Sequence, residues 1–178
     1  HVRRLGAITG DLLRFARDET DAVGPVQVNE VVARVARLLD RLLAAEGVGL
    51  ELRRAEKLPP VLASGTAVET ILVNLVLNAQ QASPPEGVVT IETRSREGSG
   101  EVEVVVRDTG PGVPEELRHR IFEPFFTTKA DSGGTGLGLA VCRTLMERQG
   151  GTIHLARTNG VGAAFVLSFP VASGRTDE

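Results

Sequence analysis

The sequence predicts a two-layer α/β sandwich, in which one mixed, largely antiparallel sheet carries helices on one face. Alternating apolar residues occur in two pairs of runs, 87–95 with 101–108 and 152–157 with 163–169, and a glycine-containing turn joins each pair. Helical apolar patterns lie between these runs. Hairpins interspersed with blocks of helix are typical of a sheet that is covered on one side.

The composition is that of one ordinary soluble domain. The 178 residues are 42% apolar, with a formal net charge of −3. Only 3% are aromatic, and Trp and Tyr are absent, which argues against a nucleic-acid surface built on base stacking. No apolar run has the length of a membrane span. We expect this domain to be cytoplasmic, and the full-length protein could be anchored by membrane segments elsewhere. The single cysteine, Cys142, excludes an internal disulfide and is expected to be buried on a helix.

Residues 1–22 form a separate helical region in this interpretation. Leu5, Ile8, Leu12 and Phe15 recur at the spacing of a heptad seam. About two heptads are too short to hold an isolated helix in water, so the seam needs a partner, either another chain or the body of the domain.

The domain itself is expected to span 23–172, with a flexible tail at 173–178. Its first strand ends at Asn29, which would cap a helix that Gly47 ends. Residues 48–55 alternate in polarity and predict a second strand.

Three further helices follow from apolar periodicity and cap residues. Residues 57–65 read as a loop that delivers Ser64 as the N-cap of a helix at 66–82. A short helix is predicted at 115–123, and a longer one at 137–150.

Polar amides interrupt the otherwise aliphatic helix at 66–82. Asn74 and Asn78 are four residues apart and share one face, and Gln81 continues the same stripe. A buried amide without partners costs about 1–3 kcal/mol, so these side chains need a polar neighbour. That neighbour could be protein backbone, a ligand, or a hard cation such as Mg²⁺, which favours oxygen ligands.

Asp108 ends a run of valines and is followed by Gly110 and Gly112. Glycines permit a tight bend and the close approach of another group. The carboxylate could accept a hydrogen bond from a ligand's amino group, or it could close the strand in an Asx-turn.

Glycine is concentrated in the segment GGTGLGL, residues 133–139. It matches neither the phosphate loop GxxxxGK[ST] nor the dinucleotide fingerprint GxGxxG, because Leu139 occupies the third glycine position. Glycines still let consecutive N–H groups turn toward one anion, and the helix that follows adds its positive N-terminal end. Lys129 supplies a cation just upstream.

Four segments, NLVLN, DTGPG, FEPFFTTK and GTGLGL, occur in that order and resemble the N, G1, F and G2 boxes of sensor histidine kinases. Their nucleotide domain has the Bergerat-type ATP-binding fold and is shared with DNA gyrase, Hsp90 and MutL. The resemblance runs from about residue 25 to residue 171 and includes the closing segment GGTIHLARTNGVGAAFVLSFP.

The resemblance implies that this domain binds ATP with Mg²⁺. Asp108 should bind the adenine amino group, Asn78 should hold Mg²⁺ with Asn74 nearby, and Phe125 and Phe126 should anchor the base of a lid in apolar surface. The ATP-binding residues implied are Asn74, Asn78, Gln81, Asp108, Gly110, Gly112, Val113, Thr128, Lys129, Gly134, Thr135, Gly136, Leu137 and Gly138.

The resemblance also implies partners. Residues 1–22 are similar to the end of the dimerisation helix, so the full-length protein should be a homodimer. The phosphoacceptor histidine should lie upstream of residue 1, because HVRRL lacks the acid and the proline of an acceptor motif. A response regulator receiver domain should take the phosphate next.

Several positions depart from the family pattern. Ala82 stands where an aromatic residue is frequent, Gln81 where a basic residue is common, and Ala163 where the closing hairpin usually has Thr. The lid, 129–133, is short. Asn74 occupies the position of the glutamate that activates water in the ATP-hydrolysing branch, and an amide cannot take that proton.

Three alternatives remain open at this point: a serine kinase of the anti-sigma type with the same fold, a gyrase- or MutL-like ATPase, and a degenerate kinase that serves only as an interaction module. Asn74 argues against the gyrase- or MutL-like ATPase. The departures at Gln81 and Ala163 are compatible with the degenerate kinase.

Overall fold

The computed structural model describes residues 22–96, 98–128, 134–158 and 160–172. The expectations for the seam from Leu5 to Phe15, for Lys129 and for the tail at 173–178 lie outside these residues.

A five-stranded sheet forms one layer of the domain. Its strand order is β2-β4-β5-β7-β6, and only the β2–β4 pair is parallel. The mixed, largely antiparallel sheet is therefore as predicted. The strands are β2 (Gly49–Arg54), β4 (Val88–Arg96), β5 (Glu101–Arg107), β6 (Thr152–Leu155) and β7 (Ala164–Pro170).

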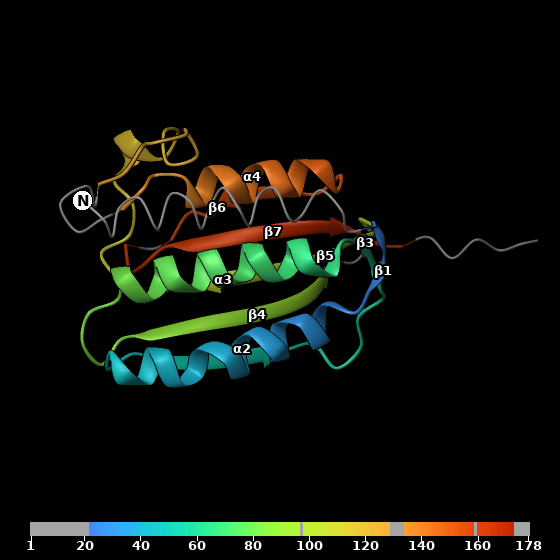
Figure 1. Ribbon diagram of the computed structural model, residues 1–178, viewed down its shortest axis with the longest axis horizontal. Helices are drawn as coiled ribbons and strands as arrows, with labels where there is room; N and C mark the ends of the chain where they lie inside the picture. Colours follow the sequence, from blue (N-terminus) through green and yellow to red (C-terminus); the bar gives the residue numbers. More distant parts are fainter. Residues whose placement is uncertain (1–21, 97, 129–133, 159, 173–178) are drawn as a thin grey trace, which may run out of the picture.

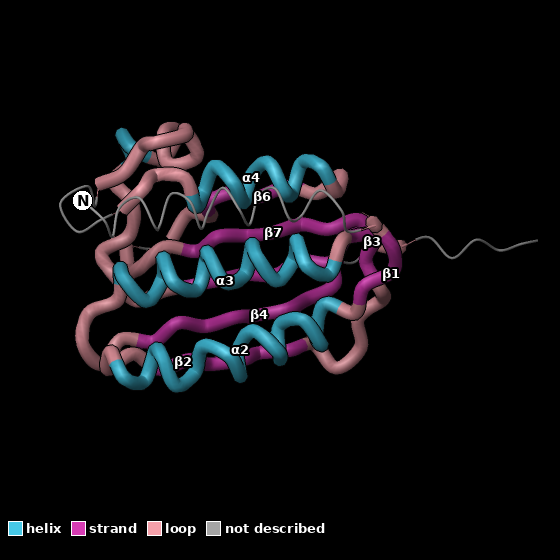
Figure 2. Tube along the Cα trace, in the orientation of Figure 1, coloured by secondary structure: helices cyan, strands magenta, loops and turns pink. Residues whose placement is uncertain are grey.

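Three helices form the second layer. Figure 1 shows α2 (Val28–Ala45), α3 (Gly65–Ala82) and α4 (Gly138–Arg148) side by side on one face of the sheet, with α3 in the middle. The same arrangement is clear in the trace coloured by secondary structure (Figure 2). The two-layer sandwich is confirmed.

The main core lies between the three helices and the sheet. Cys142 of α4 is fully buried in this core, as expected. Burying a Val, Leu or Ile side chain contributes about 1.5–3 kcal/mol, so this interface dominates the stability of the domain. Its residues with at most 1% exposure include Ile71, Leu72, Leu75, Val76, Ile91, Val104 and Leu167.

A second, two-stranded sheet lies at one end of the domain. β1 (Gly24–Val26) pairs antiparallel with β3 (Val61–Ala63). The expectation of a continuous loop at 57–65 was therefore wrong over these three residues. Val61 and Ala63 are fully buried, and β1 supplies the partner for their backbone.

Helix starts were predicted with mixed success. Ser64 caps α3 as expected, since its side chain accepts a hydrogen bond from the N–H of Ala67 at 3.1 Å. Asn29 is not a cap, because α2 already begins at Val28. Its amide instead donates to the Ala55 carbonyl oxygen and accepts from the Thr93 hydroxyl.

The helix expected at 115–123 is reduced to a single 3₁₀ turn, η2 (Glu115–Leu117). The chain from residue 118 onward follows turns and bends. Separate turn hydrogen bonds, such as those from the Arg120 N–H to Leu117 and from the Glu123 N–H to Arg120, replace a continuous helical ladder here.

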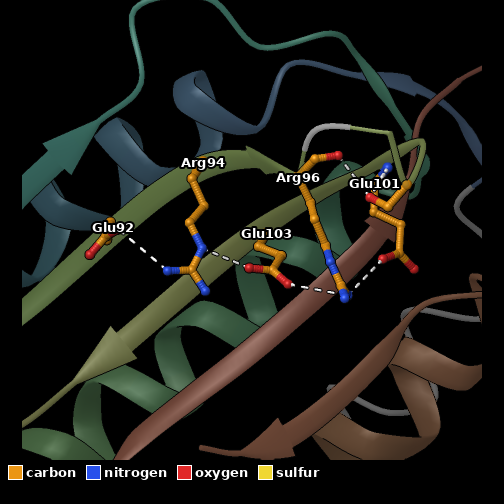
Figure 3. Close-up of polar contacts among 6 residues, drawn as sticks. Glu92, Arg94, Arg96, Glu101 and Glu103 are labelled. Carbon is orange, nitrogen blue, oxygen red and sulfur yellow. Dashed lines mark hydrogen bonds and ion pairs between the residues drawn. The ribbon is translucent and has the colours of Figure 1, made fainter.

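A row of charged residues crosses the sheet face that the three helices leave uncovered (Figure 3). We call it the charged ladder: Glu92, Arg94, Arg96, Glu101 and Glu103. Glu103 is its central member, with a side chain only 9% exposed, and the Arg94 Nε lies 2.7 Å from its carboxylate.

None of the helices in the described ranges is both long enough and apolar enough to span a membrane.

Candidate ATP-binding site

Asp108 follows β5 directly and is 4% exposed. Its Oδ1 accepts two backbone hydrogen bonds, from the N–H of Gly110 at 2.8 Å and from the N–H of Ala163 at 3.1 Å. Its own N–H donates to the Ala163 carbonyl oxygen. Within the described part of the chain, no group donates to Oδ2. The Asx-turn that the sequence suggested is present at Oδ1, and it leaves the second carboxylate oxygen available to a donor.

Glycines make this arrangement possible. A β-carbon on Gly110 would overlap the carbonyl oxygen of Ala82 at the end of α3, and one on Gly162 would overlap the main-chain oxygen of Asp108. Gly112 has a φ of +77°, and a β-carbon there would lie 2.9 Å from the Gly162 carbonyl oxygen. The loop after β5 therefore packs directly on the end of α3 and on the β6–β7 turn.

Two of the predicted amides lie on α3, and Asn78 is close to the start of α4. Asn74 and Asn78 are half-buried, so their desolvation is smaller than the sequence suggested. The Asn78 Nδ2 lies 3.8 Å from the position of a β-carbon on Gly138, the first residue of α4. Gln81 lies in the last turn of α3 and is exposed.

The glycine segment leads into α4 as predicted. Gly136 has a φ of +69°, a conformation that favours glycine, and its carbonyl oxygen accepts from the Phe125 N–H at 2.9 Å. A β-carbon on Gly136 would overlap the Phe125 backbone. The first turn of α4 presents N–H groups that have no intrahelical acceptor, as every helix N-terminus does. This end of the site suits an anion.

The two phenylalanines before the glycine segment behave differently. Phe126 packs against the main core, and Arg120 lies over its ring at 4.5 Å from the centroid. Phe125 is 74% exposed and has a φ of +66°. The predicted apolar anchor is therefore confirmed for Phe126 and wrong for Phe125, whose backbone, not its ring, contacts the glycine segment.

The remaining predicted residues occupy the rim. Val113 is half-buried against the main core, and Thr128 is exposed. Gly134, Thr135 and Leu137 are half-buried, and Thr135 Oγ1 accepts from the Leu137 N–H at 3.3 Å.

Two residues in the site were not singled out from the sequence. Gly162 shapes the position of Asp108, and the two glycines of 158–162 were read only as part of a turn. Thr109 fastens the Asp108 loop to β4, because its hydroxyl accepts from the Val88 N–H at 3.0 Å. Thr109 could have been identified from the sequence by its hydroxyl, which directly follows Asp108.

Comparison with known proteins agrees with this geometry. A sequence model of the family described as "Histidine kinase-, DNA gyrase B-, and HSP90-like ATPase" matches residues 63–173. Sensor histidine kinase ZraS of Klebsiella oxytoca is 37% identical over 98% of this chain and 37% of its own length. C4-dicarboxylate transport sensor protein DctB of Rhizobium meliloti is 36% identical over 96% of this chain and 27% of its own length. The chain thus spans about a third of these relatives.

Solved structures show the same fold. The catalytic domain of histidine kinase ThkA matches with a TM-score of 0.74 at 32% identity, over 84% of this chain and 95% of that one. Full-length ShkA in complex with AMPPNP matches with a TM-score of 0.79 at 32% identity, over 96% of this chain and 37% of that one. ThkA in complex with the response regulator protein TrrA matches with a TM-score of 0.78 at 27% identity, over 96% of this chain and 48% of that one.

The two-layer fold and the sequence both agree with these matches. The chain belongs to the histidine kinase-, DNA gyrase B- and HSP90-like ATPase family, and it is an ATP-binding catalytic domain of the sensor histidine kinase type.

Proposed function

We propose that this domain binds ATP with the purine against Asp108 and the triphosphate over residues 134–138, and that it donates the γ-phosphoryl group to a histidine in a preceding segment of the same protein. One observation carries the proposal: Asp108 Oδ1 is engaged by two backbone N–H groups, whereas Oδ2 accepts none from the described residues. A buried carboxylate with one oriented free oxygen is suited to an exocyclic amino donor such as that of adenine.

The triphosphate end is proposed from backbone chemistry. The glycine segment and the first turn of α4 offer N–H groups and the positive end of a helix dipole. In this proposal Thr128, Lys129, Gly134, Thr135, Gly136, Leu137 and Gly138 surround the phosphates. Positioning and charge stabilisation are the main contributions that a protein makes to phosphoryl transfer.

The residues present fit a magnesium ion that is shared with the nucleotide. The described residues hold no group of three or more His, Cys, Asp or Glu side chains that could bind a metal by themselves. The amide of Asn78, whose Nδ2 lies near the start of α4, would supply one oxygen ligand, and phosphate oxygens and water would complete the set that Mg²⁺ prefers. Bound Mg²⁺ neutralises negative charge on the phosphates.

The acceptor histidine is proposed to lie outside this chain. His119 follows η2, and His154 is on β6 at the edge of the sheet, away from the Asp108 loop in the strand order. In the full protein we propose a homodimer built on residues 1–22 and the preceding helices, in the cytoplasm, with a response regulator receiver domain as phosphate acceptor. The ThkA complex with TrrA supports the last of these partners.

Calorimetry with ATP and Mg²⁺ tests the proposal, with Asp108→Asn as the comparison. The Asn side-chain oxygen can still accept from Gly110 and Ala163, but its NH₂ group cannot accept from adenine. We expect at least a tenfold loss of affinity with an unchanged fold by circular dichroism. Equal affinity of the two proteins would refute the purine site.

Autophosphorylation tests the transfer step. The chain extended by its preceding segment should acquire an acid-labile, base-stable phosphate from γ-labelled ATP, as expected for phosphohistidine. An acid-stable phosphate would indicate a serine kinase instead.

A further inference from the structure

We infer that Arg118 is a positioning residue for the triphosphate end of the site, an inference that rests on the proposed ATP binding. Arg118 lies just after η2, and its side chain is only 21% exposed. Its Nη2 donates to two carbonyl oxygens at the end of β6, Leu155 at 3.1 Å and Ala156 at 2.9 Å.

Those carbonyls lie at the edge of the sheet. β6 is the last strand in the order, so among the described strands its one partner is β7. Arg118 supplies the donor that an outer strand would otherwise give to Leu155. Its Nε lies 3.6 Å from the exposed Glu115 carboxylate, so the guanidinium is oriented mainly by the two carbonyls.

Arg118 thereby fastens a segment that has little secondary structure of its own. Residues 118–126 leave η2 and run through turns to the phenylalanine pair. Farther along, the Phe122 ring packs edge-on against Phe165 of β7 with centroids 6.2 Å apart. At the far end, the Phe125 N–H donates to Gly136 of the glycine segment. The hydrogen bonds from Arg118 to Leu155 and Ala156, called the clamp below, attach one end of this segment. The contact with Gly136 attaches the other end.

The purine end does not depend on this clamp. Asp108 is held by Gly110 and Ala163, and the Ala156 N–H pairs with the Ala164 carbonyl oxygen without Arg118. Loss of the clamp should therefore misplace the chain that carries Phe125 and the adjoining glycine segment, while it leaves the Asp108 pocket intact. The expected signature is selective: ATP affinity falls and AMP affinity does not.

The geometry also predicts which residue can replace Arg118. A single nitrogen, Nη2, reaches both carbonyls, so the planar two-nitrogen fork of arginine is not required. A lysine ammonium is a point donor with three N–H groups and can serve two acceptors. Methionine has a similar apolar stem and no donor. Arg118→Lys should therefore preserve function, and Arg118→Met should not.

The test compares Arg118→Met, Arg118→Lys and the control Arg157→Met by calorimetry with ATP–Mg²⁺ and with AMP. Arg157 contacts the same Glu115 at 4.0 Å but is 90% exposed. For Arg118→Met we expect about a tenfold loss of ATP affinity, equivalent to about 1.4 kcal/mol, and less than a twofold change for AMP. Arg118→Lys and Arg157→Met should bind both nucleotides as the parent chain does.

Amide hydrogen exchange gives a second readout. Arg118→Met should accelerate exchange in 118–126 and leave α2 and α3 unchanged. Unchanged ATP affinity in Arg118→Met, or equal losses for ATP and AMP, would overturn the inference. If the parent chain bound neither nucleotide, the proposed function would fail first, and the inference would fall with it.

Discussion

Gly162 lies against Asp108 so closely that a methyl group on its α-carbon would overlap the main-chain oxygen of the aspartate. The Gly162 N–H also donates to the Gly110 carbonyl oxygen at 2.8 Å, and the Thr158 hydroxyl donates to the Gly162 carbonyl oxygen. The β6–β7 turn and the loop after β5 therefore behave as one unit around the carboxylate.

This relationship predicts that Gly162→Ala abolishes tight ATP binding. The variant combines a strained positive φ of +65° with a clash that displaces Asp108. Gly160→Ala is the matched control, because Gly160 has a φ of +86° in the same turn and nothing within 4 Å of its β-carbon position. Both substitutions should lower the free energy of unfolding by about 1–2 kcal/mol through backbone strain. Only Gly162→Ala should also weaken ATP binding more than tenfold in calorimetry; equal affinities in the two variants would contradict the coupling.

Asn78→Ala should reduce the gain in ATP affinity that Mg²⁺ provides. The Asn78 amide faces the start of α4, where the triphosphate is proposed to bind. ATP titrations with Mg²⁺ and with EDTA should differ less for the variant than for the parent chain, while AMP affinity stays constant. Thr70→Ala, two turns earlier on α3, should behave as the parent does. A full magnesium effect in Asn78→Ala would remove this residue from the metal site.

The isolated chain should hydrolyse ATP slowly even when it is saturated with ATP–Mg²⁺. Asn74 stands one helical turn before Asn78 on α3, and its amide cannot remove a proton from water at neutral pH. Steady-state phosphate release should therefore remain far below one turnover per second, whereas most enzymes turn over at about 1–10³ s⁻¹. Rapid release by the purified chain, abolished in Asp108→Asn, would show that another group activates water.

The sequence predicted those parts of the fold whose signals are local. Ser64 lies at the start of the α3 apolar pattern, and both hairpins have their turns next to their alternating runs. The Asp108 loop was found for the same reason, since aspartate and glycines are adjacent in the chain.

The features that were missed depend on partners distant in sequence. Asn29 is of a residue type that often caps helices, but its side chain forms hydrogen bonds with Ala55 and Thr93. No local pattern reveals these distant partners. β3 follows two prolines and has only three residues, too few to show the alternation of apolar and polar residues that predicts a strand. Phe125 looks like an apolar anchor until its positive φ is known. Arg118 looks like a surface arginine until the edge of the sheet is placed beside it.

Gln149→Ala should destabilise the domain without changing its site. The Gln149 amide is 7% exposed and joins two helices: its oxygen accepts from the Ser64 N–H at 2.7 Å, and its NH₂ group donates to Leu145. Removing it leaves a buried N–H unsatisfied, which costs about 1–3 kcal/mol. The melting temperature should fall by several degrees, at about 2–4 °C per kcal/mol for a chain of this size. Gln27→Ala is the control, because Gln27 is exposed and its side chain makes no capping bond.

Arg94→Ala should destabilise the domain more than the same change in an exposed pair. Glu103 has a side chain only 9% exposed, and Arg94 is its nearest cation, at 2.7 Å; Arg96 lies at 3.9 Å. Arg53 is the matched control, since it pairs with Glu51 at 3.1 Å while both side chains are more than half exposed. An exposed pair contributes about 0–1 kcal/mol, whereas removing one partner of a buried pair strands a charge.

We expect Arg94→Ala to lower the free energy of unfolding in urea by about 1–2 kcal/mol and Arg53→Ala by less than about 0.5 kcal/mol. The double variant Arg94→Ala with Glu103→Gln should recover part of the loss, because the stranded carboxylate is then neutral. Equal stabilities of Arg94→Ala and Arg53→Ala would mean that Arg96, 3.9 Å from the Glu103 carboxylate, compensates for Arg94 fully. The charged ladder would then act as a shared network and not as one dominant pair.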